Sequence, residues 1–267
     1  MDLELNGKRA LVTGGSRGIG KAIARVLAQE GADVALLARN AQTLEAAAAE
    51  IAAETGAKVV GVSADTTRDK QVHTAVAEAA RLLGGPIEIL VNAAAEPAGF
   101  AGPPKLAEIT GDFFHAEMDT KVMGYLRCAR EVAPGMQALG WGRIVNISGL
   151  AARQTGNAVG SMRNIAVAAL TKNLADELGP HGINVTVLHP GLTRTERTAP
   201  LVAARAAAQG VALQEVEAQM AAGNSINTLL DASDVAHVVA FLCSPKSRAI
   251  NGDAIAAGGG ARGGIHY

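Results

Sequence analysis

Short apolar runs with strand character alternate with helical segments along most of this chain. The runs are nearly continuous in Val, Ile, Leu and Ala, which is typical of parallel strands buried on both faces. Repeated strand and helix alternation predicts an α/β fold, in which right-handed crossovers wind the chain over both faces of one central parallel sheet. Strands are expected at 9–13, 33–38, 58–63, 87–92, 143–148, 184–189 and 254–256, and helices at 18–30, 42–54, 69–83, 113–139, 163–178 and 233–243.

The length of the chain fits one large domain. Of its 267 residues 49% are hydrophobic, which is enough to bury a sheet of this size. No repeat or linker divides the sequence, so residues 1–267 are expected to form a single domain. Within it, the Ala-rich segment 195–227 is expected to form a helical lid and 99–104 a loop rich in Gly and Pro. Pro134 is expected to kink or end the long helix around it.

A glycine-rich turn follows the first predicted strand and opens the first predicted helix. Glycine permits the tight turn and lets backbone amides approach a pyrophosphate, which the positive end of the helix also favours. A purely structural turn is the alternative. Strand, turn and helix in this order, however, indicate a doubly wound Rossmann fold that binds NAD(P). The loop residues expected to contact the dinucleotide are Gly14, Ser16, Arg17, Gly18, Ile19 and Gly20.

Two arginines indicate which dinucleotide is bound. Arg39 follows the second predicted strand, where an acidic residue would instead hydrogen-bond a free ribose hydroxyl. A guanidinium there suits a 2′-phosphate, and Arg17 in the glycine-rich loop can share it. A solvated surface charge is the alternative for Arg39. The pair favours NADP(H) as the cofactor over NAD.

Composition argues against several other classes of protein. The net charge of −1 and the absence of a basic run argue against nucleic acid as a partner. No apolar run reaches the roughly 18 residues that a membrane span needs, and the N-terminus has no apolar signal region. Cys128 and Cys243 fall in predicted helices, which fits a reducing compartment, so a cytoplasmic protein is expected. The six histidines are scattered and indicate no metal site.

Several motifs, in the right order from Lys8 to Gly260, resemble the short-chain dehydrogenase/reductase family. Residues 13–20 resemble its cofactor loop, 144–148 the strand that ends in its catalytic Ser, and 251–252 with 258–260 its closing segment. The resemblance implies hydride transfer between a nicotinamide and a carbonyl or alcohol. Further cofactor contacts that it implies are Asp65, Thr66, Asn92, Ala93, Pro190, Gly191, Thr193 and Thr195.

The resemblance breaks at the proton-transfer residues of the family. Alignment on residues 168–171 places the family's catalytic Tyr at Gly160 and its Lys at Asn164, and alignment on 122–124 places its Asn at Lys121. Glycine has no proton to donate and asparagine carries no charge. The chain has two tyrosines, Tyr125 and Tyr267, and neither is followed four residues later by Lys. Ser148 is the remaining member of the four.

Other side chains are therefore candidates for the chemistry. Lys121 and His189 are expected to join Ser148 as catalytic residues, as an acid or an electrostatic partner. Arg163 is expected to bind a substrate anion through its planar fork. The alternatives are a solvated lysine, a packed histidine and a surface arginine. His115 and the tail residues His266 and Tyr267 are further titratable options.

Three functions remain open from the sequence. The favoured one is an NADP(H)-dependent oxidoreductase that acts on a small-molecule carbonyl or alcohol with a non-standard proton donor. The alternatives are a non-redox enzyme of dehydratase or isomerase type and a catalytically inactive NADP(H)-binding protein. Small residues in 165–178 allow close helix packing, so by analogy with the family a homo-oligomer, dimer or tetramer, is expected.

Overall fold

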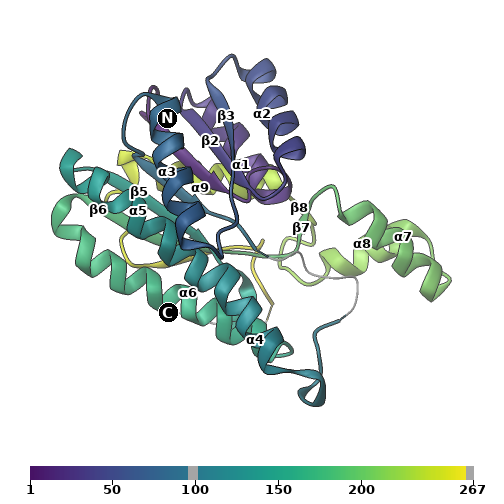
Figure 1. Cartoon of the computed structure of the whole chain (residues 1–267). Helices are drawn as coiled ribbons and strands as arrows, with labels where there is room; N and C mark the ends of the chain where they lie inside the picture. The colour runs from purple at the N-terminus through teal and green to yellow at the C-terminus, as the bar shows by residue number, and fades with distance from the viewer. Residues whose placement is uncertain (96–101, 263–267) are drawn as a thin grey trace.

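A seven-stranded parallel sheet forms the centre of the computed structural model, which describes residues 1–95 and 102–262 (Figure 1). The strand order is β3-β2-β1-β4-β5-β6-β9. This arrangement confirms the predicted doubly wound α/β fold. Residues 99–101 of the predicted loop 99–104, and His266 and Tyr267, lie outside the described residues. The strands are β1 (Arg9–Thr13), β2 (Asp33–Ala38), β3 (Val59–Ser63), β4 (Ile89–Asn92), β5 (Gly142–Ile147), β6 (Ile183–Pro190) and β9 (Ala254–Ala257).

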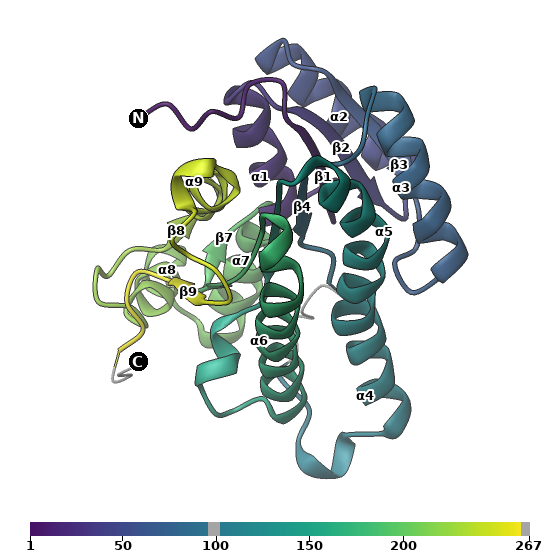
Figure 2. The same ribbon diagram turned by 90° about the vertical axis from the view of Figure 1, so that its left-hand side faces the viewer.

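Helices cover both faces of the sheet, and each face has its own apolar core (Figure 2). On one face pack α1 (Gly18–Gln29), α2 (Ala41–Thr55) and α9 (Ala232–Cys243). On the other pack α3 (Asp69–Leu83), α5 (Gly124–Leu139) and α6 (Ala158–Leu178). Burial on both faces explains why the strands are continuously apolar. Short helical turns join these elements: η1 (Leu106–Glu108), η3 (Leu150–Arg153), η4 (Gly179–His181) and η5 (Pro245–Ser247).

The strand order reverses beside β1, which places the site. β1 pairs in parallel with β2 on one side and β4 on the other, so the chain leaves these strands toward opposite faces. Thr13, Asn92 and Asn146 stand in register at the carboxyl ends of β1, β4 and β5. A crevice opens at such a point, and ligands of doubly wound folds bind there.

The predicted helix 113–139 is interrupted in the structure. It consists of α4 (Gly111–Met118), the π-helical segment η2 (Asp119–Met123) and α5, and the interruption lies well before Pro134. The expectation that the helix ends early at Pro134 was wrong, because α5 continues through it to Leu139, and a kink there stays a prediction. Pro134 is exposed, so water can satisfy the carbonyl that loses its intrahelical partner.

α6 also differs from its prediction, because it begins at Ala158 rather than at 163. The side chain of Asn157 caps it by accepting a hydrogen bond from the Gly160 amide at 2.8 Å. The sequence pattern did not predict this cap or the first turn of the helix that it begins. The two positions that align with the family's Tyr and Lys therefore lie in the first two turns of α6.

The segment predicted as a helical lid forms two helices at the side of the molecule (Figure 1). α7 (Thr198–Gln209) and α8 (Leu213–Ala221) pack on each other through a small apolar cluster that includes Val202, Val216 and Met220. The short strands β7 (Thr193–Arg194) and β8 (Leu230–Asp231) pair at the base of this segment. Its helical character is confirmed, and its role as a lid stays a prediction.

Candidate active site

A cavity of about 740 Å³ lies at the carboxyl ends of β1, β2, β4 and β5. Loops from both halves of the sheet line it, which fits the reversal of strand order beside β1. The predicted site residues that line it are Gly14, Ser16, Arg17, Gly18, Ile19, Gly20, Arg39, Asp65, Thr66, Ala93, Lys121, Ser148, Pro190 and Thr195. The fold therefore brings most of the predicted site residues to one cavity.

The glycine-rich loop is held by two close backbone approaches. Gly14 has a φ of +68°, which favours glycine, and a Cβ there would lie 2.9 Å from the Ala93 carbonyl oxygen. A Cβ on Gly20 would lie 2.3 Å from the Gly14 carbonyl oxygen, so only glycine fits where α1 starts. The turn therefore places the start of α1 at the wall of the cavity.

Three arginines line the cavity: Arg17, Arg39, which follows β2, and Arg197. The sequence assigned Arg17 and Arg39 to a 2′-phosphate and did not single out Arg197. Asn40 also lines the cavity and caps α2 by accepting from the Thr43 amide at 2.9 Å. This arrangement suits a phosphate group held beside a helix N-terminus.

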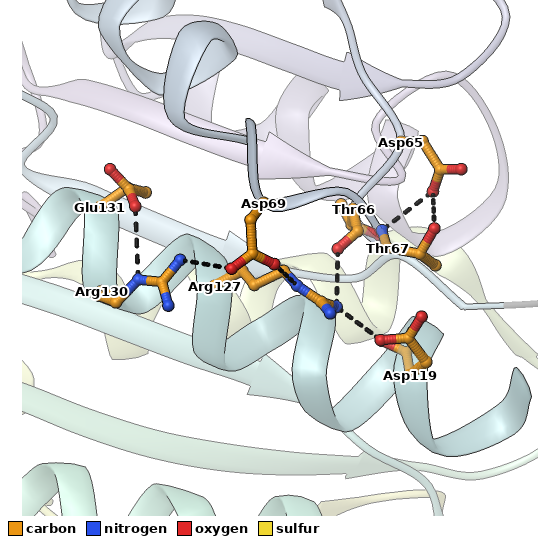
Figure 3. A network of polar contacts seen from close by, with 8 residues as sticks. All are labelled: Asp65, Thr66, Thr67, Asp69, Asp119, Arg127, Arg130 and Glu131. Carbon is orange, nitrogen blue, oxygen red and sulfur yellow. Dashed lines mark hydrogen bonds and ion pairs between the residues drawn. The ribbon is translucent and has the colours of Figure 1, made fainter. Parts of the chain in front are cut away.

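Asp65 lies in the loop after β3 and lines the same cavity. Its carboxylate accepts hydrogen bonds from the Thr67 amide at 3.0 Å and the Thr67 hydroxyl at 2.9 Å (Figure 3). Burial disfavours the charged form, but these bonds and the charges of Arg39 and Arg68 outweigh it and lower the pKa of Asp65. Asp65 is therefore a fixed carboxylate acceptor at the wall of the site.

An arginine network joins this wall to the π-helical segment (Figure 3). Arg127 on α5 donates to Asp69 at 2.5 Å, to Asp119 at 2.8 Å and to the Thr66 carbonyl at 3.3 Å. Asp119 begins η2, two residues before Lys121. One buried guanidinium thus positions both Thr66 and the turn that carries the candidate lysine.

Lys121 reaches the floor of the cavity beside Ser148. Its side chain is buried, with 4% of the residue exposed, and its Nζ donates to the Ser148 carbonyl oxygen at 2.7 Å. The Ser148 hydroxyl donates to the Asn164 carbonyl oxygen at 3.1 Å. π-Helical turns recur at functional sites because the extra residue re-aims a side chain. Here η2 directs the Lys121 side chain inward, an orientation that regular α-helical periodicity does not predict.

The charge state of Lys121 depends on burial and on two neighbours. Burial, together with the positive charge of Arg163, lowers the pKa of Lys121 to about 7, while the Glu117 carboxylate acts in the opposite direction. Glu117 on α4 and Arg163 on α6 form an ion pair with each other, and their side chains are 16% and 17% exposed. An amine that gains and loses a proton near neutral pH is suited to acid–base chemistry.

Comparison with known proteins identifies the family. The family model described as short chain dehydrogenase matches residues 8–206. The human protein "Dehydrogenase/reductase SDR family member 4" is 35% identical over 259 residues, which cover 96% of this chain and 88% of that protein. The chain belongs to the short-chain dehydrogenase/reductase family.

Reductases occur among the similar proteins of this family. The short-chain reductase protein NovJ of Streptomyces niveus is 32% identical over 252 residues, 94% of this chain and 92% of its own. The solved L-sorbose reductase of Gluconobacter frateurii, a complex with NADPH and L-sorbose, is similar with a TM-score of 0.91 and 29% identity. That match covers 99% of this chain and all of the other. The site is therefore that of a member of an oxidoreductase family.

The two positions aligned with the family's Tyr and Lys lie beside this site. A Cβ at Gly160 would meet the side chain of the capping residue Asn157 at 2.5 Å, so that side chain fills the space next to the glycine. Asn164 is buried, and its Oδ1 finds no hydrogen-bond partner among residues 1–95 and 102–262. The first turns of α6 therefore supply a carbonyl to Ser148, and no ionisable group stands at either position.

Several predicted site residues lie elsewhere within the described structure. Asn92 is buried and donates to the Asn146 side chain at 2.9 Å, tying β4 to β5. His189 is 1% exposed and its Nδ1 accepts from the Gly149 amide at 3.4 Å, which fits the packed alternative. Arg163 is engaged by Glu117. Within the described residues, those predicted for the site that are absent from the cavity wall are Asn92, His189, Gly191, Thr193 and Arg163.

The sequence reading missed some functional candidates. Glu117 precedes Lys121 by four residues. Side chains at this spacing lie on the same face of a helix, so the spacing indicated that Glu117 lies near Lys121. Glu196 and Arg197 follow the predicted cofactor contact Thr195 directly and line the cavity. No motif marked them, because their position depends on how the segment after β7 folds back over the glycine-rich loop. Tyr125, in contrast, is a core residue whose hydroxyl donates to the Ile147 carbonyl at 2.8 Å.

The described residues hold neither a metal site nor a helix that could cross a membrane. Within 1–95 and 102–262, no group of three or more His, Cys, Asp or Glu side chains is placed to hold a metal ion. In the same residues, no helix combines the length and apolarity that a membrane crossing requires. Cys128 and Cys243 are buried, and burial raises the pKa of each thiol to about 12.

Proposed function

We propose that this protein is an NADP(H)-dependent oxidoreductase that interconverts a small carbonyl compound and its alcohol, with Lys121 as the proton-transfer residue. One observation carries the proposal. A buried lysine whose pKa is lowered to about 7 lies in the cavity and binds the backbone of Ser148 at 2.7 Å. The family's chemistry needs an acid–base group at this serine, and Lys121 is placed to supply it.

The residues of the cavity fit NADP(H). The glycine-rich loop offers amides at the start of α1 and leaves no room there for a side chain at Gly20. Arg17, Arg39 and Arg197 supply positive charge where a 2′-phosphate would be recognised. Asp65 is held as an acceptor beside them. The NADPH complex of the Gluconobacter frateurii reductase supports the same cofactor for this chain.

When bound, NADPH supplies a hydride to the carbonyl carbon of the substrate. In the direction of reduction, the Lys121 ammonium donates a proton to the carbonyl oxygen, and the resulting amine is reprotonated from solvent. The Ser148 hydroxyl orients that oxygen by hydrogen bonding. Before the transfer, the ammonium is held by the Ser148 carbonyl, which fixes its direction. In the direction of oxidation, the neutral amine accepts the alcohol proton.

Other groups near the site are less suited to this step. Gly160 and Asn164 offer no acidic proton at neutral pH. The Tyr125 hydroxyl is fully buried and bonded to a backbone carbonyl, and burial raises its pKa. Arg163 is a permanent cation paired with Glu117. Lys121 is therefore the proton source that we propose.

Assembly and location remain part of the proposal. We infer a homo-oligomer in the cytoplasm, as the sequence predicted. Met162 and Ile165 on α6 are 48% and 53% exposed, which leaves apolar surface on the helix that the family analogy places between subunits. Sedimentation of the purified protein tests this, because a monomer at all accessible concentrations would contradict it.

The decisive experiment measures NADPH oxidation by its absorbance against a panel of ketones, aldehydes and thioester carbonyls. Each substrate is also followed by mass spectrometry for loss of water or isomerisation. Substrate-dependent NADPH oxidation that is abolished in K121M supports the proposal. Conversion of substrate without any change in the nicotinamide would establish the non-redox alternative, and NADPH binding without conversion across the panel would favour the inactive one.

A further inference from the structure

A carboxylate from a distant loop caps the first helix at the glycine-rich turn. The backbone amide of Gly18 donates to Oε2 of Glu196 at 3.1 Å, across 178 positions of sequence. Both residues line the large cavity. Gly18 is the first residue of α1, so its amide is one that a helix leaves without an internal partner.

The first turn of α1 contains no acidic side chain. Its first turn reads Gly-Ile-Gly-Lys, and among the described residues the side chain of Arg17 forms no capping hydrogen bond there. Glu196 therefore supplies the negative charge that the positive end of the helix attracts. A side chain that belongs to the segment between β7 and α7 acts as the missing cap.

The loop that carries Glu196 is held in place by a reciprocal pair of hydrogen bonds. The Thr195 amide donates to the Thr198 hydroxyl at 2.9 Å, and the Thr198 amide donates to the Thr195 carbonyl oxygen at 2.9 Å. Thr198 is 6% exposed, so this turn is anchored at the start of α7. A Cβ at Gly18 would lie 3.7 Å from the Thr195 methyl group, so the loop covers the glycine-rich turn closely.

The same amides serve the pyrophosphate of a dinucleotide, and two anions at one helix N-terminus repel each other. We propose that Glu196 is a built-in competitor of the cofactor pyrophosphate, and that cofactor binding displaces its carboxylate from Gly18. The proposal rests on the proposed function, because it assigns the cavity to NADP(H). Since Glu196 sits just before α7, its displacement couples occupation of the cofactor site to the position of the predicted lid.

The test compares NADPH affinity, measured by calorimetry, in the wild type, E196Q and E196A. Glutamine keeps an oxygen that can accept from Gly18 but removes the charge, and alanine removes both. Loss of the competing anion is expected to tighten NADPH binding by about 3- to 10-fold in both variants. E215Q, a charge change on α8 away from the cavity wall, serves as the matched control and is expected to bind NADPH like the wild type.

Two smaller probes separate the pyrophosphate from the rest of the cofactor. Adenosine 2′-monophosphate carries the phosphate expected near Arg39 but has no pyrophosphate, so its affinity is expected to stay the same in E196Q. Inorganic pyrophosphate is expected to bind E196Q more tightly than the wild type. If E196Q binds pyrophosphate and NADPH more tightly than the wild type does, but binds the monophosphate equally, the competition takes place at Gly18.

The outcomes distinguish this inference from the proposed function. If the wild type binds NADPH and E196Q binds it equally or more weakly, Glu196 does not compete and the inference is overturned. Weaker binding in E196A with unchanged binding in E196Q would show that the side chain holds the loop over the cofactor instead. If neither the wild type nor any variant binds NADPH, the assignment of the cavity fails, and the inference fails with it.

Discussion

Lys121 Nζ lies 2.7 Å from the carbonyl oxygen of Ser148, so the buried amine and the retained serine share one wall of the cavity. The contact joins a π-helical segment to the end of β5, two elements that the sequence separates by 27 positions. It puts an ionisable group beside Ser148, whose hydroxyl we propose orients the substrate.

Replacing Lys121 should abolish turnover without preventing cofactor binding. K121M keeps most of the apolar volume but removes the proton, so the rate of carbonyl reduction is expected to fall by about 10²- to 10⁴-fold. NADPH affinity, measured by fluorescence, is expected to change little, because the lysine transfers a proton rather than holding phosphate. Steady-state kinetics on the best substrate of the panel provide the measurement.

K121R provides the control for charge. Its guanidinium keeps a positive charge but does not lose a proton at accessible pH, so it is expected to remain slow. Recovery of wild-type rates in K121R would mean that a fixed cation suffices and that Lys121 does not transfer a proton.

The pH dependence of turnover should follow the charge of Lys121. Reduction requires the ammonium, so its kcat is expected to fall about tenfold per pH unit above pH 7, given the pKa of about 7. Oxidation requires the neutral amine, so its kcat is expected to rise with pH up to about 7 and then level off. Opposite profiles for the two directions, measured with the same substrate pair, would support this assignment.

The same ionisation predicts a stability profile that needs no substrate. The pKa of Lys121 is lowered to about 7 in the folded protein and is about 10.4 for an unfolded lysine. Between these values the unfolded chain binds the extra proton, so folding stability rises with pH. Urea unfolding of the wild type should show this rise relative to K121M. Parallel curves for the two proteins would contradict a lowered pKa.

Glu117 and Arg163 should act on the rate through Lys121. The Glu117 carboxylate raises the pKa of Lys121 and the Arg163 guanidinium lowers it. E117Q is therefore expected to move the reductive pH profile to lower pH, and R163Q to higher pH. The double variant should lie closer to the wild type than either single one, because the opposing charges are removed together.

This experiment also tests the earlier expectation that Arg163 binds substrate. A substrate-binding arginine would raise KM in R163Q by about 10-fold or more and leave the pH profile where it was. A shifted pH profile in R163Q with little change in KM would show that the Glu117–Arg163 ion pair acts through Lys121 and does not bind substrate. Circular dichroism checks that each variant still folds, since the pair joins α4 to α6.

Removing Arg39 should weaken binding of NADPH but not of NADH. The charge-assisted bonds of a guanidinium to phosphate are worth about 1.5 to 3 kcal/mol, so R39Q is expected to lose about 10- to 100-fold in NADPH affinity. NADH lacks the 2′-phosphate and should bind R39Q about as well as the wild type. R25Q, on the outer face of α1 where Arg25 pairs with Glu50 and Glu54, is the control. An equal loss for both cofactors would contradict recognition of the 2′-phosphate.

Arg127 should contribute much more to stability than its neighbour Arg130. Both contact Asp69, but the Arg127 side chain is 11% exposed and that of Arg130 is 54% exposed. R127M leaves the Thr66 carbonyl and two carboxylates with fewer partners and is expected to cost about 1 to 3 kcal/mol of unfolding free energy. R130M is expected to change it by at most about 1 kcal/mol. Equal losses in denaturant unfolding would contradict a special role for the buried arginine.

Much of the fold was accessible from local sequence patterns. The predicted bounds of β1, β2 and α3 coincide with those of the structure, because continuous apolar runs and helix-ending glycines mark them directly. The π-helical segment at Asp119 was not predicted, because no local sequence pattern marks it; in the fold Arg127 bonds both Asp119 and the distant Asp69. The continuation of α5 through Pro134 depends on the exposure of that residue.

Local sequence was enough to predict the family, the parallel sheet and the position of the glycine-rich loop, since these rest on neighbouring residues and on backbone conformations that only glycine adopts. It also marked Ser148 and Lys121 as candidates. Three contacts came from the folded arrangement: Lys121 is buried against Ser148, Arg163 pairs with Glu117, and Glu196 accepts from the Gly18 amide. Those contacts join residues far apart in the chain, and their effect on charge arises from burial, which the folded arrangement alone creates.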